Sequence, residues 1–333
     1  GVYDWATWDA ILGVFAEFSQ LELVAVIVDA PQWATSHPFD PTSQRTAPPD
    51  DPQTYADFTG MFAERYGDIV DYYQVWDEPN ITLGWGNLPP NATHYVAMLQ
   101  MAYQAIHAKD PSAHVISAGL APTIEVGYDN YNEFDFMRDL YANGAQDYAD
   151  AWAGMPYGFE HSPQDRIADV NHLNLSRFVM LREIMTQYGD ADKPLWASAW
   201  GWNALPQNWA GNPSIWRDVS QQDQIAYTLD ALARAEREWA WLGGMILYHW
   251  QPDASFDDPR WGFSVMGQDD QPTAFYEALK NRPISEFATD GVYPAQNPFA
   301  TYSGAWTFTG LGADIGWVQD SALEFVFEGR DIA

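Results

Sequence analysis

The residues with the clearest chemical signature are Asp77 and Glu78, two acids that directly follow an aromatic and aliphatic run ending at Trp76. Such a run is typical of a buried parallel strand that carries a carboxylate to the mouth of a barrel. Pro79 has no backbone N–H to donate, so we expect the strand to end there. Trp76 beside the acids would offer an apolar wall of sugar size. The alternative is an ordinary surface turn after a core strand.

Aromatic side chains also follow other predicted strands, where they would line a sugar subsite. They are Trp33, Tyr157, Trp200, Trp202 and Trp250. The alternative is that they cap the core of the barrel, and for Trp200 we favour that alternative. His249 precedes Trp250, so the two side chains point to opposite sides of the strand. His249 is a candidate polar contact, with a buried and satisfied histidine as the equal alternative.

The elements that position these residues alternate between apolar runs and segments of helical periodicity. Strands are expected at 21–28, 73–76, 114–118, 149–155, 194–200 and 244–250, and helices at 5–18, 52–66, 93–108, 134–142, 173–188, 220–239 and 272–280. This order predicts an α/β fold with parallel strands. Candidate functional residues at the ends of many strands favour a closed (β/α)8 TIM barrel. Six strands rather than eight imply a segment that lacks the first strands.

The sequence also predicts how the chain divides. Residues 1–285 would form the barrel and 286–300 a linker rich in Pro, Ala and Asn. Residues 301–333 alternate apolar and polar side chains, which indicates the beginning of an antiparallel β-sandwich. Loops 34–51, 81–91 and 203–218 would carry subsite specificity.

Composition narrows the class of function. The 333 residues carry a net charge of -31, which argues against nucleic acid and against an anionic membrane surface. The sequence contains no apolar run of 18 residues, the length that would indicate a membrane-spanning helix. An acidic, lysine-poor composition suits a secreted or cell-surface protein, or a salt-exposed one, and it also simply favours solubility. Without cysteines there is no thiolate chemistry, and without paired histidine motifs we expect neither a catalytic metal nor a cofactor.

Several motifs together resemble the clan of retaining glycoside hydrolases on (β/α)8 barrels, most of all the branch with β-xylosidases and α-iduronidase. The resemblance covers roughly residues 3–280. The motifs are Asp4-Trp5 to Asp9, Ala30-Pro31-Gln32-Trp33, Trp76-Asp77-Glu78-Pro79-Asn80, Met155-Pro156-Tyr157-Gly158 and Pro194 to Trp202. By this resemblance Glu78 is the acid/base, and Trp33, Trp76, Asp77, Asn80, Tyr157, Trp202, His249 and Trp250 contact substrate.

Retaining hydrolysis needs two carboxylates about 5–5.5 Å apart, one as acid/base and one as nucleophile. The resemblance places the nucleophilic glutamate where this chain has Ala199. Met155 stands where the family usually has a histidine, and Asp77 where asparagine is commoner. Glu125, Glu160 and Asp29 are alternative acids near the mouth, although ordinary loop acids are the simpler interpretation. Loss of the nucleophile alone would cost orders of magnitude in rate.

Three hypotheses follow. The first is a catalytically impaired barrel that binds an oligo- or polysaccharide or acts as a scaffold in a larger protein. The second is an active retaining O-glycosidase whose nucleophile was mutated to Ala199. The third is a purely structural module of a surface assembly. Self-assembly or further domains of the same chain are additional candidate partners.

Overall fold

A computed structural model describes most of the chain. The described residues are 3–42, 45–125, 127, 129–282, 288, 292–293, 295, 299–303, 306–309, 312–315 and 321–329. The chain divides into two compact units, Gly1–Gly154 and Met155–Ala333, which we describe separately.

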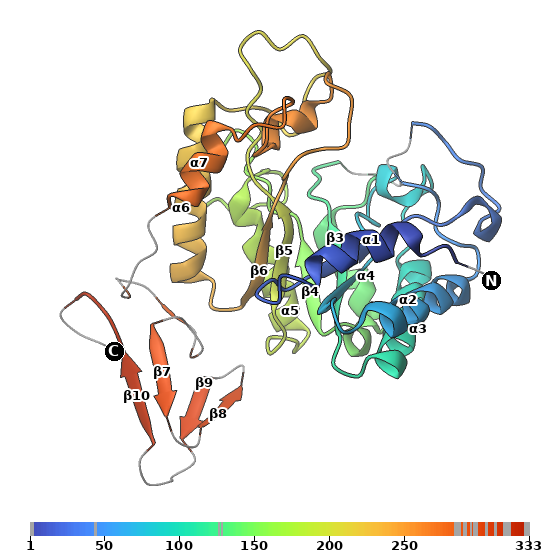
Figure 1. Cartoon of the computed structure of the whole chain (residues 1–333), viewed down its shortest axis with the longest axis horizontal. Helices are drawn as coiled ribbons and strands as arrows, with labels where there is room; N and C mark the ends of the chain where they lie inside the picture. Colours follow the sequence, from blue (N-terminus) through green and yellow to red (C-terminus); the bar gives the residue numbers. More distant parts are fainter. Residues whose placement is uncertain are drawn as a thin grey trace. The chain divides into compact units, whose positions relative to one another are not determined.

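Six strands form one sheet in the order of the chain (Figure 1). They are β1 (Val24–Ile27), β2 (Tyr72–Val75), β3 (His114–Leu120), β4 (Ala151–Gly154), β5 (Leu195–Trp200) and β6 (Leu242–Leu247). The neighbours β1 and β2, β2 and β3, β3 and β4, and β5 and β6 pair in parallel. The α/β fold with six parallel strands expected from the sequence is confirmed.

The α-helices of the first unit are α1 (Ala6–Phe15), α2 (Pro52–Tyr66), α3 (Ala92–Lys109) and α4 (Glu133–Ala142), and its short 3-10 helices are η1 (Gln32–Ala34), η2 (Leu83–Trp85) and η3 (Ala145–Tyr148). The residues before α2, α3 and α4 cap these helices with their side chains, whereas Trp5 before α1 does not. Asp51 accepts a hydrogen bond from the backbone N–H of Gln53, and Asn91 does so from His94. These bonds satisfy donors that the first turn of a helix leaves open.

The second unit contains α5 (Phe178–Gln187), α6 (Gln221–Glu238) and α7 (Ala274–Lys280), with 3-10 helices η4 (Leu175–Arg177) and η5 (Pro259–Phe263). The expected start of α6 is confirmed, because the Ser220 hydroxyl accepts a hydrogen bond from the backbone N–H of Asp223 at 3.0 Å. Thr273 caps α7 in the same manner. Such a cap typically contributes about 1 kcal/mol to helix stability.

Four short strands follow: β7 (Ala300–Ser303), β8 (Trp306–Thr309), β9 (Gly312–Ile315) and β10 (Ala322–Phe325). β10 pairs with β7, and β8 with β9, and both pairs are antiparallel. Antiparallel pairing in this region is therefore confirmed, while a complete β-sandwich stays a prediction. Most of the predicted linker, 286–300, lies outside the described residues.

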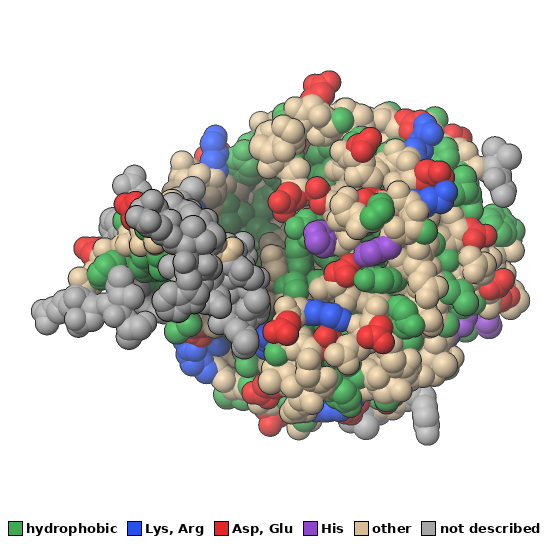
Figure 2. Space-filling view, turned by 90° about the horizontal axis from the view of Figure 1, so that it is seen from below, with side chains coloured by type: hydrophobic (Ala, Val, Ile, Leu, Met, Phe, Trp, Pro, Cys, Tyr) green, Lys and Arg blue, Asp and Glu red, His purple; other side chains and the backbone are tan. Residues whose placement is uncertain are grey.

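The surface agrees with the acidic composition. On the face shown in Figure 2, acidic side chains are dispersed among hydrophobic and basic ones rather than gathered in one patch. Among the helices that the structure describes, none combines the length and apolar character needed to span a bilayer.

Candidate functional site

The backbone at the end of β2 presents Glu78 in a constrained conformation. Trp76 and Glu78 have positive φ angles of 68° and 51°, which L-residues rarely adopt outside special sites. Asp77 forms a parallel bridge with Gly119, and the N–H of Glu78 donates to the Gly119 carbonyl at 3.0 Å. A Cβ on Gly84 would lie 2.2 Å from the Glu78 carbonyl oxygen, so only glycine allows η2 to approach. The turn is therefore held from two sides.

The carboxyls of Asp77 and Glu78 have pKa values well above their ordinary range. Burial raises the pKa of Glu78 to about 8, with the charge of Asp77 adding to the shift and Arg45 opposing it. Burial likewise raises the pKa of Asp77 to about 6, against the charge and hydrogen bond of Arg45 at 3.2 Å and the amide of Gln74 at 3.0 Å. Adjacent carboxyls titrate as a pair. Glu78 thus holds a proton at neutral pH, as a general acid must.

Two neighbours of Glu78 serve the scaffold. Trp76 has 0% of its surface exposed, and its indole N–H donates to the Gly84 carbonyl at 2.9 Å. A ring without exposed surface cannot stack on a sugar, so in this structure Trp76 packs in the core and does not form the expected wall. Asn80 is also fully buried, and its amide bonds to the backbone of Ala121 and Tyr131. Asn80 therefore fixes the loop after Glu78 and has no surface left for a ligand.

Ala199, the position of the expected nucleophile, belongs to the second unit and lies in an apolar cluster. Only 7% of its surface is exposed. The buried members packed with it are Met155, Tyr157, Phe159 and Phe263, and the partly buried Leu173, Trp216 and Tyr248 contact this cluster. The structure thus brings together Ala199 and Met155, the two expected departures from the family pattern, and Tyr157, one of the aromatic candidates.

The remaining aromatic candidates divide by exposure. Trp202 is buried, and its indole N–H donates to the His161 carbonyl at 2.7 Å. Tyr157 is buried as well, so neither ring presents a face to a ligand in this structure. Trp250 and Trp33 are exposed by 61% and 70%, which leaves both rings available.

His249 is half-buried, and its Nδ1 is a buried atom without a hydrogen-bond partner among the described residues. Burial lowers the pKa of His249, and the nearby charge of Arg260 lowers it further. The imidazole is therefore neutral at physiological pH, with a nitrogen free to accept or donate one hydrogen bond. The expectation of a buried and satisfied histidine does not describe this side chain.

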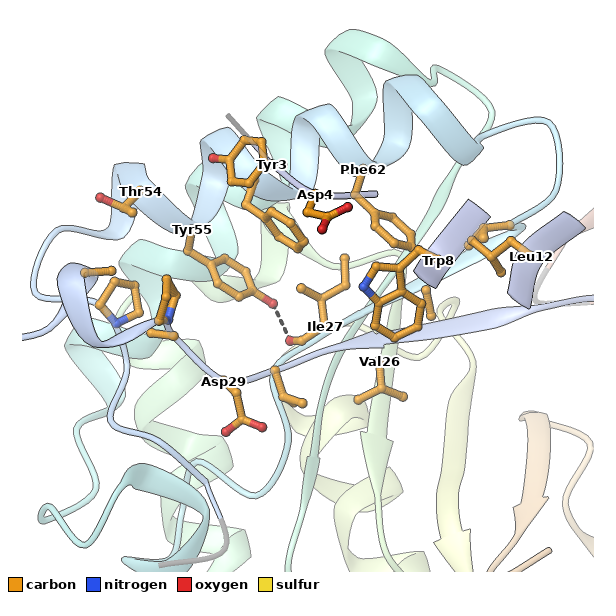
Figure 3. A pocket seen from close by; sticks show the side chains of 18 of the residues that line it. Tyr3, Asp4, Trp8, Leu12, Val26, Ile27, Asp29, Thr54, Tyr55 and Phe62 are labelled. Atoms are coloured by element: carbon orange, nitrogen blue, oxygen red, sulfur yellow. Dashed lines mark hydrogen bonds between the residues drawn. The ribbon is translucent and has the colours of Figure 1, made fainter. Parts of the chain in front are cut away.

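A cavity of about 1020 Å³ opens in the first unit between α1, β1 and α2 (Figure 3). Apolar side chains dominate its lining, and the hydroxyl of Tyr55 is bound to the Ile27 carbonyl at 2.6 Å. Trp33 and Asp29 contribute to the wall, but Glu78 does not line it. Because β1 is the first strand of the sheet, the cavity lies along a sheet edge rather than at the acidic pair.

A second cavity, of about 630 Å³, lies in the second unit. The residues that line it were not predicted individually from the sequence. Trp209 and Trp261 are half-buried in its wall, with Phe256 exposed beside them. The two indole N–H groups donate to the carbonyls of Asn212 and Ser255, which fixes the ring orientations. The only signal in the sequence was the placement of subsite specificity in loop 203–218, which carries Trp209.

Comparison with family models gives no match for this chain, and comparison with curated protein sequences gives none either. Solved structures do share its fold. A family 39 glycoside hydrolase from Bacteroides cellulosilyticus matches with a TM-score of 0.63 and 16% identity, over 90% of this chain and 58% of that one. A glucosidase from Croceicoccus marinus matches with a TM-score of 0.60 and 16% identity, over 84% of this chain and 53% of that one. A monomeric beta-xylosidase from Caulobacter crescentus matches with a TM-score of 0.57 and 18% identity, over 84% of this chain and 56% of that one.

The chain therefore has a glycoside-hydrolase-like α/β fold, and the fold expected from the resemblance is confirmed. It spans only 53% to 58% of the length of these three proteins. At such low identity the similarity concerns the fold alone, so activity must be argued from the side chains.

Proposed function

We propose that this protein binds an oligo- or polysaccharide and does not hydrolyse it. The observation that carries the proposal is the surroundings of Ala199, where a methyl group packs against Met155 and aromatic rings. Retaining hydrolysis requires a carboxylate that attacks the anomeric carbon. An ionised carboxylate among apolar side chains costs several kcal/mol unless it is paired. The apolar surroundings therefore suit alanine better than glutamate, and we infer that alanine is the natural residue at position 199.

The proposed carbohydrate site is the cavity formed by Trp209, Phe256 and Trp261. Its volume of about 630 Å³ lies within the range of about 300–1,000 Å³ typical of small-molecule sites. Aromatic faces stack on the apolar faces of sugar rings, and amides can bond to hydroxyls. Asn208 and Gln268 in the lining supply such amides. The exposed Trp250 is a further candidate contact on the same unit.

One observation favours a second candidate function, an active retaining O-glycosidase in which a glutamate belongs at position 199. Glu78 has a pKa raised to about 8, as expected of a proton donor at neutral pH. In that case the Ala199→Glu variant should cleave aryl glycosides. The acidic composition supports placing the protein outside the cell or on its surface, and a scaffold role in a larger assembly is compatible with both candidates.

The proposal is tested with the parent protein, Ala199→Glu and Ala199→Val against a panel of glycans and aryl glycosides. We expect no turnover from any of them. Ala199→Glu should lose about 2–5 kcal/mol of stability, and more than Ala199→Val, since it adds a charge as well as volume. Hydrolysis by Ala199→Glu at ordinary enzyme rates would reject the proposal and establish the second candidate.

Binding is measured by tryptophan fluorescence and calorimetry with the same glycans. We expect Trp209→Ala and Trp261→Ala to weaken binding by about tenfold each, since a stacking ring contributes roughly 1–1.5 kcal/mol. Trp8→Ala is the matched control, because Trp8 is an exposed tryptophan on α1. A panel that leaves the parent silent in both assays would argue for a purely structural module.

A further inference from the structure

Three potential metal ligands converge in the loop between β4 and α5. Oδ2 of Asp165 lies 2.5 Å from Nε2 of His172 and 3.6 Å from Nδ1 of His161. All three atoms lie within 4.8 Å of one another. The centroids of the two imidazole rings lie 4.4 Å apart with the ring planes tilted by 44°, and all three residues are half-buried. Two histidines thus aim at the same carboxylate oxygen, although they are eleven positions apart in the sequence.

The loop that holds these ligands is organised by buried polar side chains. Oδ1 of Asp165 accepts a hydrogen bond from the backbone N–H of Ile167 at 3.1 Å, which turns Oδ2 toward the histidines. Asn174 donates to the Ile167 carbonyl at 2.9 Å, and Arg177 donates to the Val170 carbonyl at 2.7 Å. Asn174 and Arg177 are almost completely buried. In metal sites, a hydrogen bond to the ligating carboxylate, such as the one from Ile167 to Asp165, fixes its orientation.

We propose that His161, Asp165 and His172 bind a divalent transition-metal ion, and that zinc is the ion that fits best. Two imidazole nitrogens and one carboxylate oxygen are a common three-ligand set for zinc, with water or another group in the fourth position. Calcium and magnesium prefer oxygen ligands only, so the imidazoles select against them.

The geometry needs only a small adjustment. Ligand atoms about 2.0–2.1 Å from a tetrahedral zinc are about 3.3 Å from one another. The Asp165–His172 contact would open from 2.5 Å by less than about 1 Å, and the 3.6 Å contact to His161 would close by a few tenths. The two histidine nitrogens, which lie within 4.8 Å of each other, would also move to about 3.3 Å.

The site would stabilise the neighbourhood of a buried aromatic residue. The carbonyl of His161 accepts the indole N–H of Trp202, and a Cβ on Gly158 would lie 1.9 Å from the Trp202 ring. A zinc ion bound to both His161 and His172 would therefore cross-link this loop at His161, the residue whose carbonyl holds Trp202. None of the three ligands belongs to the cluster around Ala199, so the ion would lie outside that cluster.

The test is calorimetric titration of zinc into the full, metal-stripped chain, together with its His161→Phe and His37→Ala variants. The parent should bind one zinc ion per chain, and zinc should slow hydrogen exchange in 161–172. His161→Phe keeps a ring against His172 and leaves the Asp165–His172 hydrogen bond in place, so it should fold. It should weaken zinc binding by at least about 100-fold, since even the loss of a residue that only hydrogen-bonds to a ligand costs 10–100-fold. His37, an exposed loop histidine, should be dispensable.

Cobalt provides an independent readout, because a cobalt ion bound in the parent should give a visible absorption band that zinc abolishes. Equal zinc affinity of the parent and His161→Phe would overturn the proposal. Equal competition by calcium would also overturn it, since that result indicates attraction to the acidic surface. In either case the Asp165–His172 contact would be a plain hydrogen bond.

Discussion

Replacing Glu78 by glutamine should stabilise the protein at alkaline pH and leave its stability almost unchanged at acidic pH. Burial raises the pKa of Glu78 from 4.5 to about 8. Between these two values the folded protein holds a proton that the unfolded chain has released. The free energy of unfolding therefore falls as the pH rises through this window, and the loss is complete above pH 8. Glutamine has the same shape and no charge, so it escapes this loss.

The magnitude follows from the same pKa values. One pKa unit corresponds to about 1.4 kcal/mol, so the difference between 4.5 and about 8 corresponds to about 5 kcal/mol. Part of the Glu78 surface is in contact with water, which screens the charge and reduces the expected gain to about 3 kcal/mol. Asp77→Asn should retain most of the pH dependence, because burial raises the pKa of Glu78 more than the neighbouring charge does.

Urea unfolding of the parent and Glu78→Gln at a series of pH values from 4.5 to 9 measures the effect directly. The difference in the free energy of unfolding should be near zero at pH 4.5 and grow steadily to its full value at about pH 8. Glu17→Gln, at an exposed site after α1, is the matched control and should show no such trend. A difference that is constant over the whole range would refute the reasoning, because it would mean that Glu78 titrates alike in the folded and unfolded states.

Three further predictions concern the scaffold. Gly158→Ala should cost about 1–3 kcal/mol, because its Cβ would lie 1.9 Å from the ring of Trp202; an unchanged melting temperature would contradict this packing. Asn80→Ala should cost about 2–4 kcal/mol in urea unfolding, since three hydrogen bonds at a fully buried site are lost. Hydrogen bonds from Arg166 and other contacts lower the pKa of Glu238 to about 2. Glu238→Gln should thus lose about 1–2 kcal/mol at pH 7, a loss that fades as the pH falls from 4.5 toward 2.

The helices and strands were predictable because local signals and tertiary packing agree. α2 begins and ends where the sequence indicates, since Asp51 supplies the cap and Pro52 suits the first helical position. All six strands of the sheet were expected, although β1 is shorter than the apolar run 21–28. The 3-10 helices were missed, because such short turns carry little periodicity.

Side-chain directions at the strand ends were less predictable. The alternation of side-chain direction along a strand fails where Trp76 and Glu78 take positive φ angles. Trp76 was expected to form an apolar wall for a sugar, but its side chain lies in the core. The cavity around Trp209 and the cluster of His161 and His172 depend on how long loops fold back on themselves. Such contacts join residues through tertiary hydrogen bonds that no local spacing encodes.

The contrast between Glu78 and Ala199 bears on whether the barrel binds a ligand or serves only as a scaffold. Ala199 lies in an apolar and well-packed cluster, which is favourable for stability. At Asp77 and Glu78 the chain keeps two acids with raised pKa values on a turn with two positive φ angles. Each strained residue costs of order 1–3 kcal/mol, and the half-buried acids add to that cost. A pure scaffold gains nothing from these features, since substitutions that relieve them are readily found. Their retention favours the second candidate function, in which Glu78 donates a proton. If the protein only binds glycans in the cavity around Trp209, which Glu78 does not line, Glu78→Gln should stabilise the fold and leave glycan binding unchanged.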